Sequence, residues 1–387
     1  MLVSESSRRG GGPATSFKVL IVASLRYPIG QPFAGGLEAH TWSLACGLRA
    51  RGHSVLVAGA AGSDTGVVGY EFGELPAAGP AERPDITDHP LVSRAERAAY
   101  GGLMDQLRDG LLGSFDVIHN NSLHPGPVER ASTLPSPMVT TLHTPRLAWA
   151  DRLLGGSDRA TAPRVPGRDR SFVAVSRATA ALWRPLIRPR IVRNGVDTTV
   201  WRAGSGGSGA VWSGRIVPEK APHLAIDLAR AAGVELTIAG PVIDQDYFAG
   251  AITPRLGPRV RYAGHLAQAD LANLVGSSAV ALVTPVWNEP FGLVAAEALA
   301  CGTPVVAFSR GGLPEIVDPA VGRLIPPVSG PEFPPDRLAA AVGAVTAVTA
   351  LDRRVVRRRA VARLGRAAMI RGYEGVYADL ARQWNAA

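Results

Sequence analysis

Short apolar runs recur along the chain and alternate with longer amphipathic or polar stretches. In the first half these runs occupy residues 17–23, 55–58, 115–118, 138–142 and 172–175. Apolar runs of this length are typical of strands buried on both faces, and the stretches between them are long enough for crossover helices. Apolar positions at Leu37, Leu44 and Leu48 predict one such helix, which ends near Gly52. The alternation therefore predicts a doubly wound α/β fold with a parallel sheet.

A second series of the same kind follows a segment rich in glycine and serine. Its apolar runs occupy residues 210–213, 235–239, 260–263, 279–283 and 304–308. We predict a Rossmann-like domain at residues 17–195, a linker at residues 196–210 and a second Rossmann-like domain at residues 211–371. The stretch beyond is rich in alanine, valine and arginine and is expected to be helical.

The length of 387 residues suits two ordinary domains, and a hydrophobic content of 46% excludes global disorder. No apolar run is long enough to span a bilayer. Residues 1–16 are polar and lack the apolar segment of a signal peptide, so we expect a disordered tail on a cytoplasmic protein. Cys46 and Cys301 stand in apolar helical contexts and are expected to be small buried residues.

The formal net charge is +9, and almost all of the positive charge is arginine. Of 41 basic residues only Lys18 and Lys220 are lysine, which indicates a compositional bias that leaves most arginines without an individual role. No basic patch interleaved with aromatic residues is present, so we do not expect a nucleic-acid partner. Five arginines between residues 353 and 359 are read as a solvated helix face with at most weak peripheral membrane contact.

The segment from Trp287 to Val317 carries the strongest chemical signal. Glu289 and Glu297 flank the start of an expected helix, with Asn288 as its N-cap and Pro290 at its first position. Two carboxylates placed in this way can hold the hydroxyl groups of a sugar and of a ribose. Free backbone N–H groups at a helix start, here at Leu293 and Val294, can hold a diphosphate between them. The segment therefore predicts a nucleotide-sugar site.

Several other motifs lie at the ends of expected strands. Gly35 and Gly36 precede a helix and can present N–H groups to phosphate, Arg215 and Lys220 can neutralise a diphosphate, and His143 follows a strand. Gly264 and His265 end a strand of the second domain. Considered alone, the glycine pair is equally compatible with a plain turn, Lys220 with a solvated helix-start lysine, and His143 with a loop histidine.

Taken in order along the chain, these motifs resemble those of the retaining glycosyltransferases of family 4 (GT4), which adopt the GT-B fold. The resemblance implies two Rossmann-like domains facing across a cleft, with a final helix at residues 372–387 that crosses back to the first domain. It implies that His143 and Glu289 act at the reaction centre and that the nucleoside lies near Gly264, His265 and Glu297. The other implied roles are diphosphate binding by Gly35, Gly36, Arg215, Lys220, Leu293 and Val294, and sugar binding by Glu289, Pro290, Phe291 and Gly292.

No metal site and no cofactor are expected. The chain has no Asp-x-Asp pair directly after a strand and no histidine or cysteine cluster with ligand spacing. In the interpretation offered here, Arg215 and Lys220 stabilise the leaving diphosphate in place of a metal ion.

The expected partners are a nucleotide-sugar donor and a small-molecule acceptor, as in natural-product biosynthesis. A UDP sugar is ranked ahead of a GDP sugar, and the oligomeric state is left open. Alternatives are a lipid-linked or cell-envelope acceptor at a membrane surface, and a protein that binds nucleotide sugars without consuming them. Acceptor specificity is expected in the first-domain segment 62–113, because loops vary on a fixed scaffold.

Overall fold

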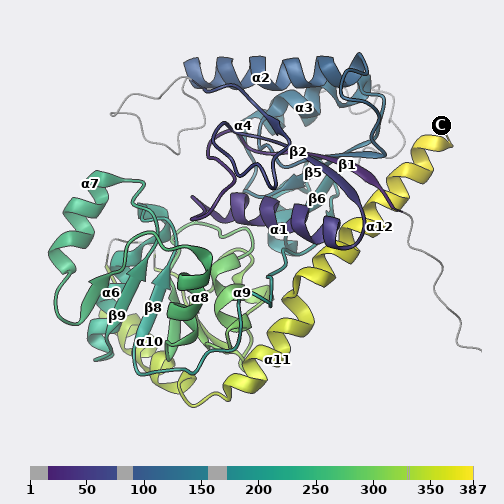
Figure 1. The fold of residues 1–387 in the computed structure, drawn as a ribbon. Helices are drawn as coiled ribbons and strands as arrows, with labels where there is room; N and C mark the ends of the chain where they lie inside the picture. The colour runs from purple at the N-terminus through teal and green to yellow at the C-terminus, as the bar shows by residue number, and fades with distance from the viewer. Residues whose placement is uncertain (1–15, 76–89, 156–171, 329, 331, 387) are drawn as a thin grey trace, which may run out of the picture.

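The chain forms two α/β domains that are joined by two crossings of the backbone (Figure 1). The computed structural model describes residues 16–75, 90–155, 172–328, 330 and 332–386. The expected N-terminal tail lies outside the described residues except for Ser16, and so does part of the segment in which we expect acceptor specificity.

The first domain contains a parallel sheet in the order β3-β2-β1-β4-β5-β6-β7. Its strands are Lys18–Val22 (β1), Ser54–Gly59 (β2), Tyr70–Glu71 (β3), Val117–Asn120 (β4), Met138–Leu142 (β5), Phe172–Ala174 (β6) and Arg190–Ile191 (β7). Its helices are Gly36–Ala50 (α1), Pro90–Arg108 (α2), Pro125–Arg130 (α3), Ala148–Leu154 (α4) and Arg177–Trp183 (α5). In register, Val19 of β1 pairs with Val55 of β2 and with Val117 of β4.

Side chains of β1 alternate between two cores, as the pleat of a strand requires. Val19 and Ile21 pack with α1 on one face of the sheet. Leu20 and Val22 pack on the other face with residues of α2. Helices therefore cover both faces, which explains why the strands read as continuous apolar runs.

The second domain repeats the architecture with a parallel sheet in the order β10-β9-β8-β11-β12-β13. Its strands are Ala210–Ser213 (β8), Leu236–Ala239 (β9), Val260–Tyr262 (β10), Val280–Val283 (β11), Val305–Phe308 (β12) and Gly322–Ile325 (β13). Its helices are Pro222–Ala231 (α6), Gln245–Tyr247 (α7), Gln268–Gly276 (α8), Leu293–Ala300 (α9), Pro335–Val348 (α10) and Arg353–Leu364 (α11). The prediction of two doubly wound domains is confirmed.

Three strands were not anticipated from the apolar pattern. β3 and β7 are two residues long and lie at the edges of their sheet. β13 contains Arg323 and is an edge strand too, so it lacks a continuous apolar run. Edge strands bury less surface than central ones, and hydrophobic patterning marks them weakly.

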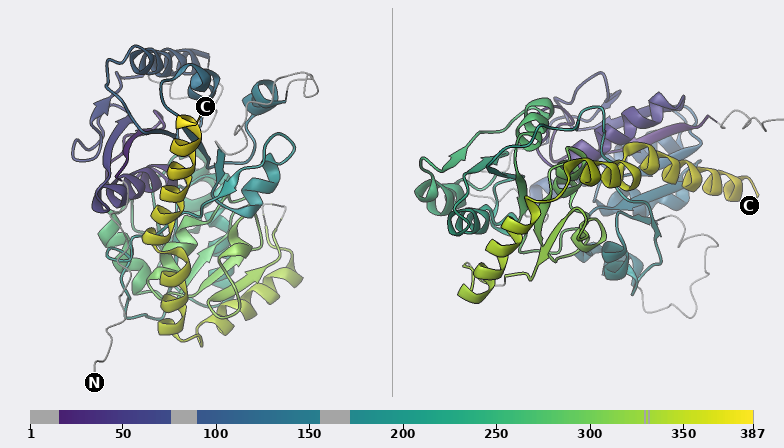
Figure 2. Two further views of the ribbon diagram at one scale, coloured as in Figure 1. Left: turned by 90° about the vertical axis from the view of Figure 1, so that its right-hand side faces the viewer. Right: turned by 90° about the horizontal axis from the view of Figure 1, so that it is seen from below.

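The last helix, Arg366–Asn385 (α12), carries the chain back to the first domain (Figure 2). Met369, Ile370, Tyr373 and Tyr377 are buried in the same core as β1 and α1. The helix begins at Arg366, earlier than the predicted residue 372. At the crossing, Val196 forms a parallel bridge with Gly365, so the two connections between the domains run side by side.

The glycines of the predicted linker pack tightly against the second domain. The amide of Gly204 donates to the carbonyl of Cys301 at 3.0 Å, and that of Gly206 donates to Gly276 at 3.0 Å. A Cβ on Gly204 would lie 2.1 Å from the oxygen of Gly276. These glycines permit close backbone approach and do not form a free tether.

The arginine cluster at residues 353–359 also differs from the expected solvated face. Arg353 donates to the carbonyls of Ser278 and Gly276 at 2.9 and 2.8 Å, and Arg357 donates to Trp201 at 2.7 Å. Arg359 pairs with Asp318 at 3.1 Å. Arg353 and Arg357 therefore hold neighbouring segments together, whereas Arg354, Arg358 and Arg359 are exposed as expected.

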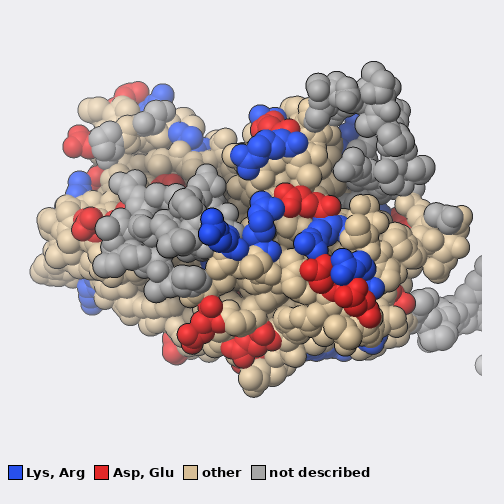
Figure 3. All heavy atoms as spheres, turned by 90° about the horizontal axis from the view of Figure 1, so that it is seen from above, with Lys and Arg blue, Asp and Glu red and all other residues tan. Residues whose placement is uncertain are grey.

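Within the described residues, no helix combines the length and the apolar character needed to cross a membrane. On the face that Figure 3 shows, basic side chains lie beside acidic ones. In the first domain a basic and an acidic side chain also pair at the surface, as Arg97 and Glu129 do at 2.9 Å. Cys301 is buried as expected, whereas Cys46 is half-buried, and both thiols are free.

Candidate active site

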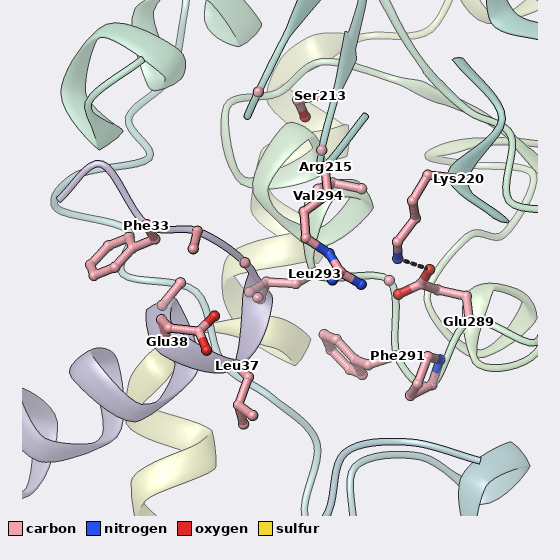
Figure 4. Close-up of a pocket in the computed structure, with 18 of the residues that line it drawn as sticks. Phe33, Leu37, Glu38, Ser213, Arg215, Lys220, Glu289, Phe291, Leu293 and Val294 are labelled. Atoms are coloured by element: carbon pink, nitrogen blue, oxygen red, sulfur yellow. Dashed lines mark hydrogen bonds and ion pairs between the residues drawn. The ribbon is translucent and has the colours of Figure 1, made fainter. Parts of the chain in front are cut away.

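A cavity of about 510 Å³ lies between the two domains, where the carboxyl ends of both sheets face each other. Loops after β1 and β5 line it from the first domain, and loops after β8, β9 and β11 line it from the second. Ligands of open α/β sheets bind at such carboxyl ends. The fold therefore places the residues that the sequence singled out at one site (Figure 4).

The loop before α9 forms one wall of the cavity and corrects the predicted helix start. α9 begins at Leu293, with Gly292 as its N-cap at φ 93°, so Asn288 and Pro290 lie in the loop. A Cβ on Gly292 would lie 2.5 Å from Leu313, and the left-handed φ is unfavourable for other residues. The carbonyl of Glu289 accepts from the amide of Gly312 at 2.7 Å, so this backbone is committed to tertiary contacts rather than helical ones.

Lys220 and Glu289 form an ion pair inside the cavity (Figure 4). Lys220 Nζ lies 2.6 Å from Glu289 Oε2, and both side chains are mostly buried, at 21% and 14% exposure. The indole N–H of Trp287 donates to the same oxygen at 3.1 Å, and the ammonium lies 4.8 Å from the centre of the Trp287 ring. Both contacts with the carboxylate fall on Oε2, so Oε1 can accept from a ligand hydroxyl.

Arg215 reaches across the cavity toward α1 of the first domain (Figure 4). Its Cδ lies 3.6 Å from the position that a Cβ on Gly35 would occupy. Glu38, in the first turn of α1, is 5% exposed, and burial raises the pKa of its carboxyl while its own backbone N–H, Arg215 and Arg26 lower it. The start of α1 at Gly35 and Gly36 therefore lies beside the carboxyl group of Glu38.

Glu297 lies one turn into α9 and lines the cavity. Its exposure is 7%, and burial raises the pKa of its carboxyl to about 8. At neutral pH the group is therefore largely protonated and can donate as well as accept a hydrogen bond. Leu293 and Val294, the first two residues of the same helix, also line the cavity, and N–H groups at a helix start lack intrahelical partners.

His143 follows β5, as predicted, and lines the cavity from the first domain. Its Nε2 lies 3.0 Å from Asn121 Oδ1, an acceptor, so Nε2 carries the proton and Nδ1 is the acceptor nitrogen. Burial, together with His40 and His119, holds the pKa of His143 well below its ordinary value. His40 packs edge-on against His143 with ring centres 4.7 Å apart. His143 is therefore a neutral imidazole.

Three glycines follow the carboxyl ends of the neighbouring strands β8, β9 and β10 in the second sheet. The amide of Gly214 donates to Ala239 at 3.0 Å, and that of Gly240 donates to Gly264 at 2.9 Å. A Cβ on Gly240 would lie 1.9 Å from the oxygen of Gly214, so the backbones stack directly. His265 lines the cavity and hydrogen-bonds across it to the carbonyl of Phe33 at 2.9 Å, whereas Gly264 does not line it.

Apart from Gly264, every residue that the sequence predicted for the site lines the cavity. Sequence reasoning missed Glu38, Phe33 and the three tryptophans Trp201, Trp212 and Trp287. An acid in the first turn of a helix is an ordinary stabilising feature, so Glu38 gave no distinct signal. The described residues contain no group of histidine, cysteine, aspartate or glutamate that could hold a metal ion.

Family models cover both domains. One described as glycosyltransferase family 4 matches residues 34–200, and one described as glycosyl transferases group 1 matches residues 208–339. The chain is 30% identical to a glycogen synthase of Mycobacterium tuberculosis, over 77% of this chain and 80% of that protein. It is 30% identical to a D-inositol 3-phosphate glycosyltransferase of Mycobacterium marinum, over 84% of this chain and 77% of that one.

Solved structures share the whole fold. A glycosyltransferase involved in avilamycin A biosynthesis superposes with a TM-score of 0.65 at 24% identity, over 95% of this chain and 98% of that chain. HepE of Anabaena, solved in complex with UDP-glucose, superposes with a TM-score of 0.66 at 19% identity, over 94% of this chain and 100% of that chain. Both likenesses extend over the two domains.

Proposed function

The chain belongs to glycosyltransferase family 4 and is a glycosyltransferase of the GT-B fold, and from this premise we propose its substrates and mechanism. The donor is a nucleotide diphosphate sugar, with a UDP-hexose ranked ahead of a GDP-hexose. The acceptor is a small polar molecule, and the anomeric configuration is retained. The observation that carries this proposal is the mostly buried Lys220–Glu289 pair at the cavity wall, beside Arg215 and the start of α9.

The cavity supplies what the transfer requires. Departure of the nucleoside diphosphate breaks the bond between the anomeric carbon and the phosphate oxygen and builds negative charge there, which Arg215, Lys220 and the N–H groups of Leu293 and Val294 can stabilise. The acceptor oxygen bonds to the anomeric carbon from the same face, and its proton passes to the leaving phosphate. No residue is needed as a covalent nucleophile in this scheme.

The sugar is proposed to lie between Glu289 of the second domain and His143 of the first. Glu289 Oε1 would accept from sugar hydroxyls, and the Nδ1 atom of neutral His143 would accept from another. Glu297 would hold the ribose hydroxyls from α9. The nucleoside roles of Gly264 and His265 stay a prediction, and the observed bond of His265 to Phe33 places the imidazole at the mouth between the domains.

The acceptor class rests on the relatives and on the first-domain wall. The name of one relative, D-inositol 3-phosphate glycosyltransferase, contains a small polar acceptor. The first-domain side of the cavity offers Arg26 and Thr144 as polar contacts. We propose a small-molecule acceptor of this polar class, as in natural-product assembly, with a lipid-linked acceptor as the alternative that the assay must distinguish.

A donor panel tests the proposal. The protein is incubated with UDP-, GDP- and ADP-hexoses, with small polyol acceptors or with membrane lipid extract, and nucleoside diphosphate release is measured. We expect release with a UDP-hexose that a small polyol accelerates, and a product whose anomeric configuration by NMR matches the donor. Acceleration by lipid extract alone would move the acceptor to the membrane, and failure with every donor would refute the proposed function.

Activity is expected to survive a chelator. In the proposed mechanism Arg215 and Lys220 stabilise the leaving diphosphate, so no divalent cation is required. Turnover of the accepted donor should stay within about twofold after treatment with excess EDTA. Loss of turnover that magnesium or manganese restores would show that a metal ion takes part.

A further inference from the structure

The first domain holds the loop of residues 289–292 by a backbone carbonyl. Ser176 Oγ lies 2.6 Å from the carbonyl oxygen of Pro290, and Thr179 Oγ1 lies 3.1 Å from it. Ser176 is the N-cap of α5, and its oxygen accepts from the amide of Thr179 at 2.9 Å. Each hydroxyl has one proton, so both can donate to Pro290 while the cap is kept. All three residues are buried.

A second contact lies beside the first and joins the same two domains. Glu315, in the second domain, accepts from the amide of Ala178 at 2.9 Å and pairs with Arg193 at 3.3 Å. Its side chain is 13% exposed. We refer to the bonds of Ser176 and Thr179 to Pro290, together with those of Glu315, as the interdomain clasp.

The loop is thus fixed at adjacent residues from opposite sides. The carbonyl of Glu289 is held by Gly312 of its own domain, and the carbonyl of Pro290 is held by the first domain. The side chain of Glu289, with its bond to Lys220, branches from the Cα atom next to the first of these carbonyls. A change in the distance between the domains therefore acts directly on the residue that faces the donor sugar.

We propose that Ser176 and Thr179 are positioning residues, which set the orientation of the 289–292 loop for the donor sugar when the domains are together. The inference rests on the proposed role of this loop in sugar binding. In the proposed mechanism most contacts to the nucleoside and diphosphate come from α9 and Arg215, which form no bond of the clasp, and Lys220 links to the loop only through Glu289. Loss of the clasp should therefore affect sugar transfer more than nucleotide binding.

Substitutions at Thr179 separate the hydroxyl from the volume of the side chain. Thr179→Val keeps the shape and removes the donor, and we expect kcat to fall roughly three- to tenfold, the effect of losing one hydrogen bond. Thr179→Ser keeps the hydroxyl and should stay within about twofold. The Kd of UDP, which lacks the sugar, should change less than about twofold in both. Equal losses in the two variants, or a matching loss of UDP affinity, would overturn the proposal.

Ser176→Asp separates the helix cap from the clasp. The carboxylate can still accept from the Thr179 amide, but it repels the Pro290 carbonyl, so we expect a larger fall in kcat than for Thr179→Val. Asp352 caps α11 away from the cavity by accepting from the amide of Arg354, so Asp352→Ala shows how much kcat changes when a helix cap alone is disturbed. It should leave kcat within about twofold. Retained kcat in Ser176→Asp would overturn the proposal.

Hydrogen exchange tests the clasp without any turnover. Amides in residues 287–293 should exchange several-fold faster in Thr179→Val and Ser176→Asp than in the unchanged protein or in Thr179→Ser. Unchanged exchange in both variants would refute the clasp. Failure of the unchanged protein to consume any donor would refute the proposed function instead, and the exchange data would still decide the clasp.

Discussion

Replacing Lys220 by alanine is expected to lower kcat about 30- to 1000-fold, which corresponds to about 2 to 4 kcal/mol of transition-state stabilisation. Lys220 pairs with Glu289 at 2.6 Å and would contact the leaving diphosphate. Its removal takes away a cation and leaves a mostly buried carboxylate unpaired beside the sugar. Steady-state rates with the accepted donor and far-ultraviolet circular dichroism measure activity and fold together.

Lys18→Ala is the matched control, because Lys18 is the other lysine of the chain. Its ammonium lies 5.1 Å from the centre of the Phe115 ring, and it does not line the cavity. Turnover of this variant should stay within about twofold. If Lys220→Ala also kept near-native turnover, the assignment of the donor site would be refuted.

Glu289→Ala should lower kcat to a similar extent, and its effect should not add to that of Lys220→Ala. The two groups touch each other, and residues that share an interaction give non-additive changes in free energy. In the double variant neither charge is left unpaired, so its loss should be smaller than the sum of the single losses. Additive losses in log kcat would show that the pair acts as two independent contacts.

The fold could be predicted from the sequence because central strands carry a strong signal. Met138–Leu142 and Ala210–Ser213 have the bounds that the apolar runs indicate. The helix start at Leu293 was missed because Asn288 and Pro290 fit the local preferences of a helix N-terminus. What overrides those preferences is tertiary: Gly311 and Gly312 pack on the backbone of Glu289 and Pro290. Local sequence statistics do not contain that contact.

The chemistry of the sequence motifs identifies the residues of the site, but it does not identify the residues that they contact. Motifs place a lysine, an arginine and one glutamate on loops that follow strands of the second domain, and a second glutamate in a helix. The GT-B resemblance implies that the first domain faces them. The pairing of Lys220 with Glu289 depends on how two loops of the second domain meet. The proximity of Glu38 to Arg215 and the hydrogen bond of Ser176 to Pro290 depend on how the two domains meet. Contacts between residues far apart in the sequence produce no periodic pattern of hydrophobic and polar positions.

The buried carboxyl of Glu297 is expected to make stability depend on pH. Burial raises its pKa from 4.5 to about 8, so the folded protein keeps this proton at pH values where the unfolded chain has released it. Between the two values the folded state binds more protons, and the free energy of unfolding falls as pH rises. The loss is complete above about pH 8, and a shift of this size corresponds to on the order of 5 kcal/mol.

Glu297→Gln removes this dependence, because an amide has no charged form and fills nearly the same volume. The melting temperature of the variant minus that of the unchanged protein should therefore increase from about pH 5 to about pH 8 and then level off, by several degrees in total. Calorimetry of both proteins across this range measures the difference, and pH effects of other groups cancel in it. A difference that stays constant with pH would show that Glu297 is already ionised in the folded protein, with the charge stabilised by a group in the cavity.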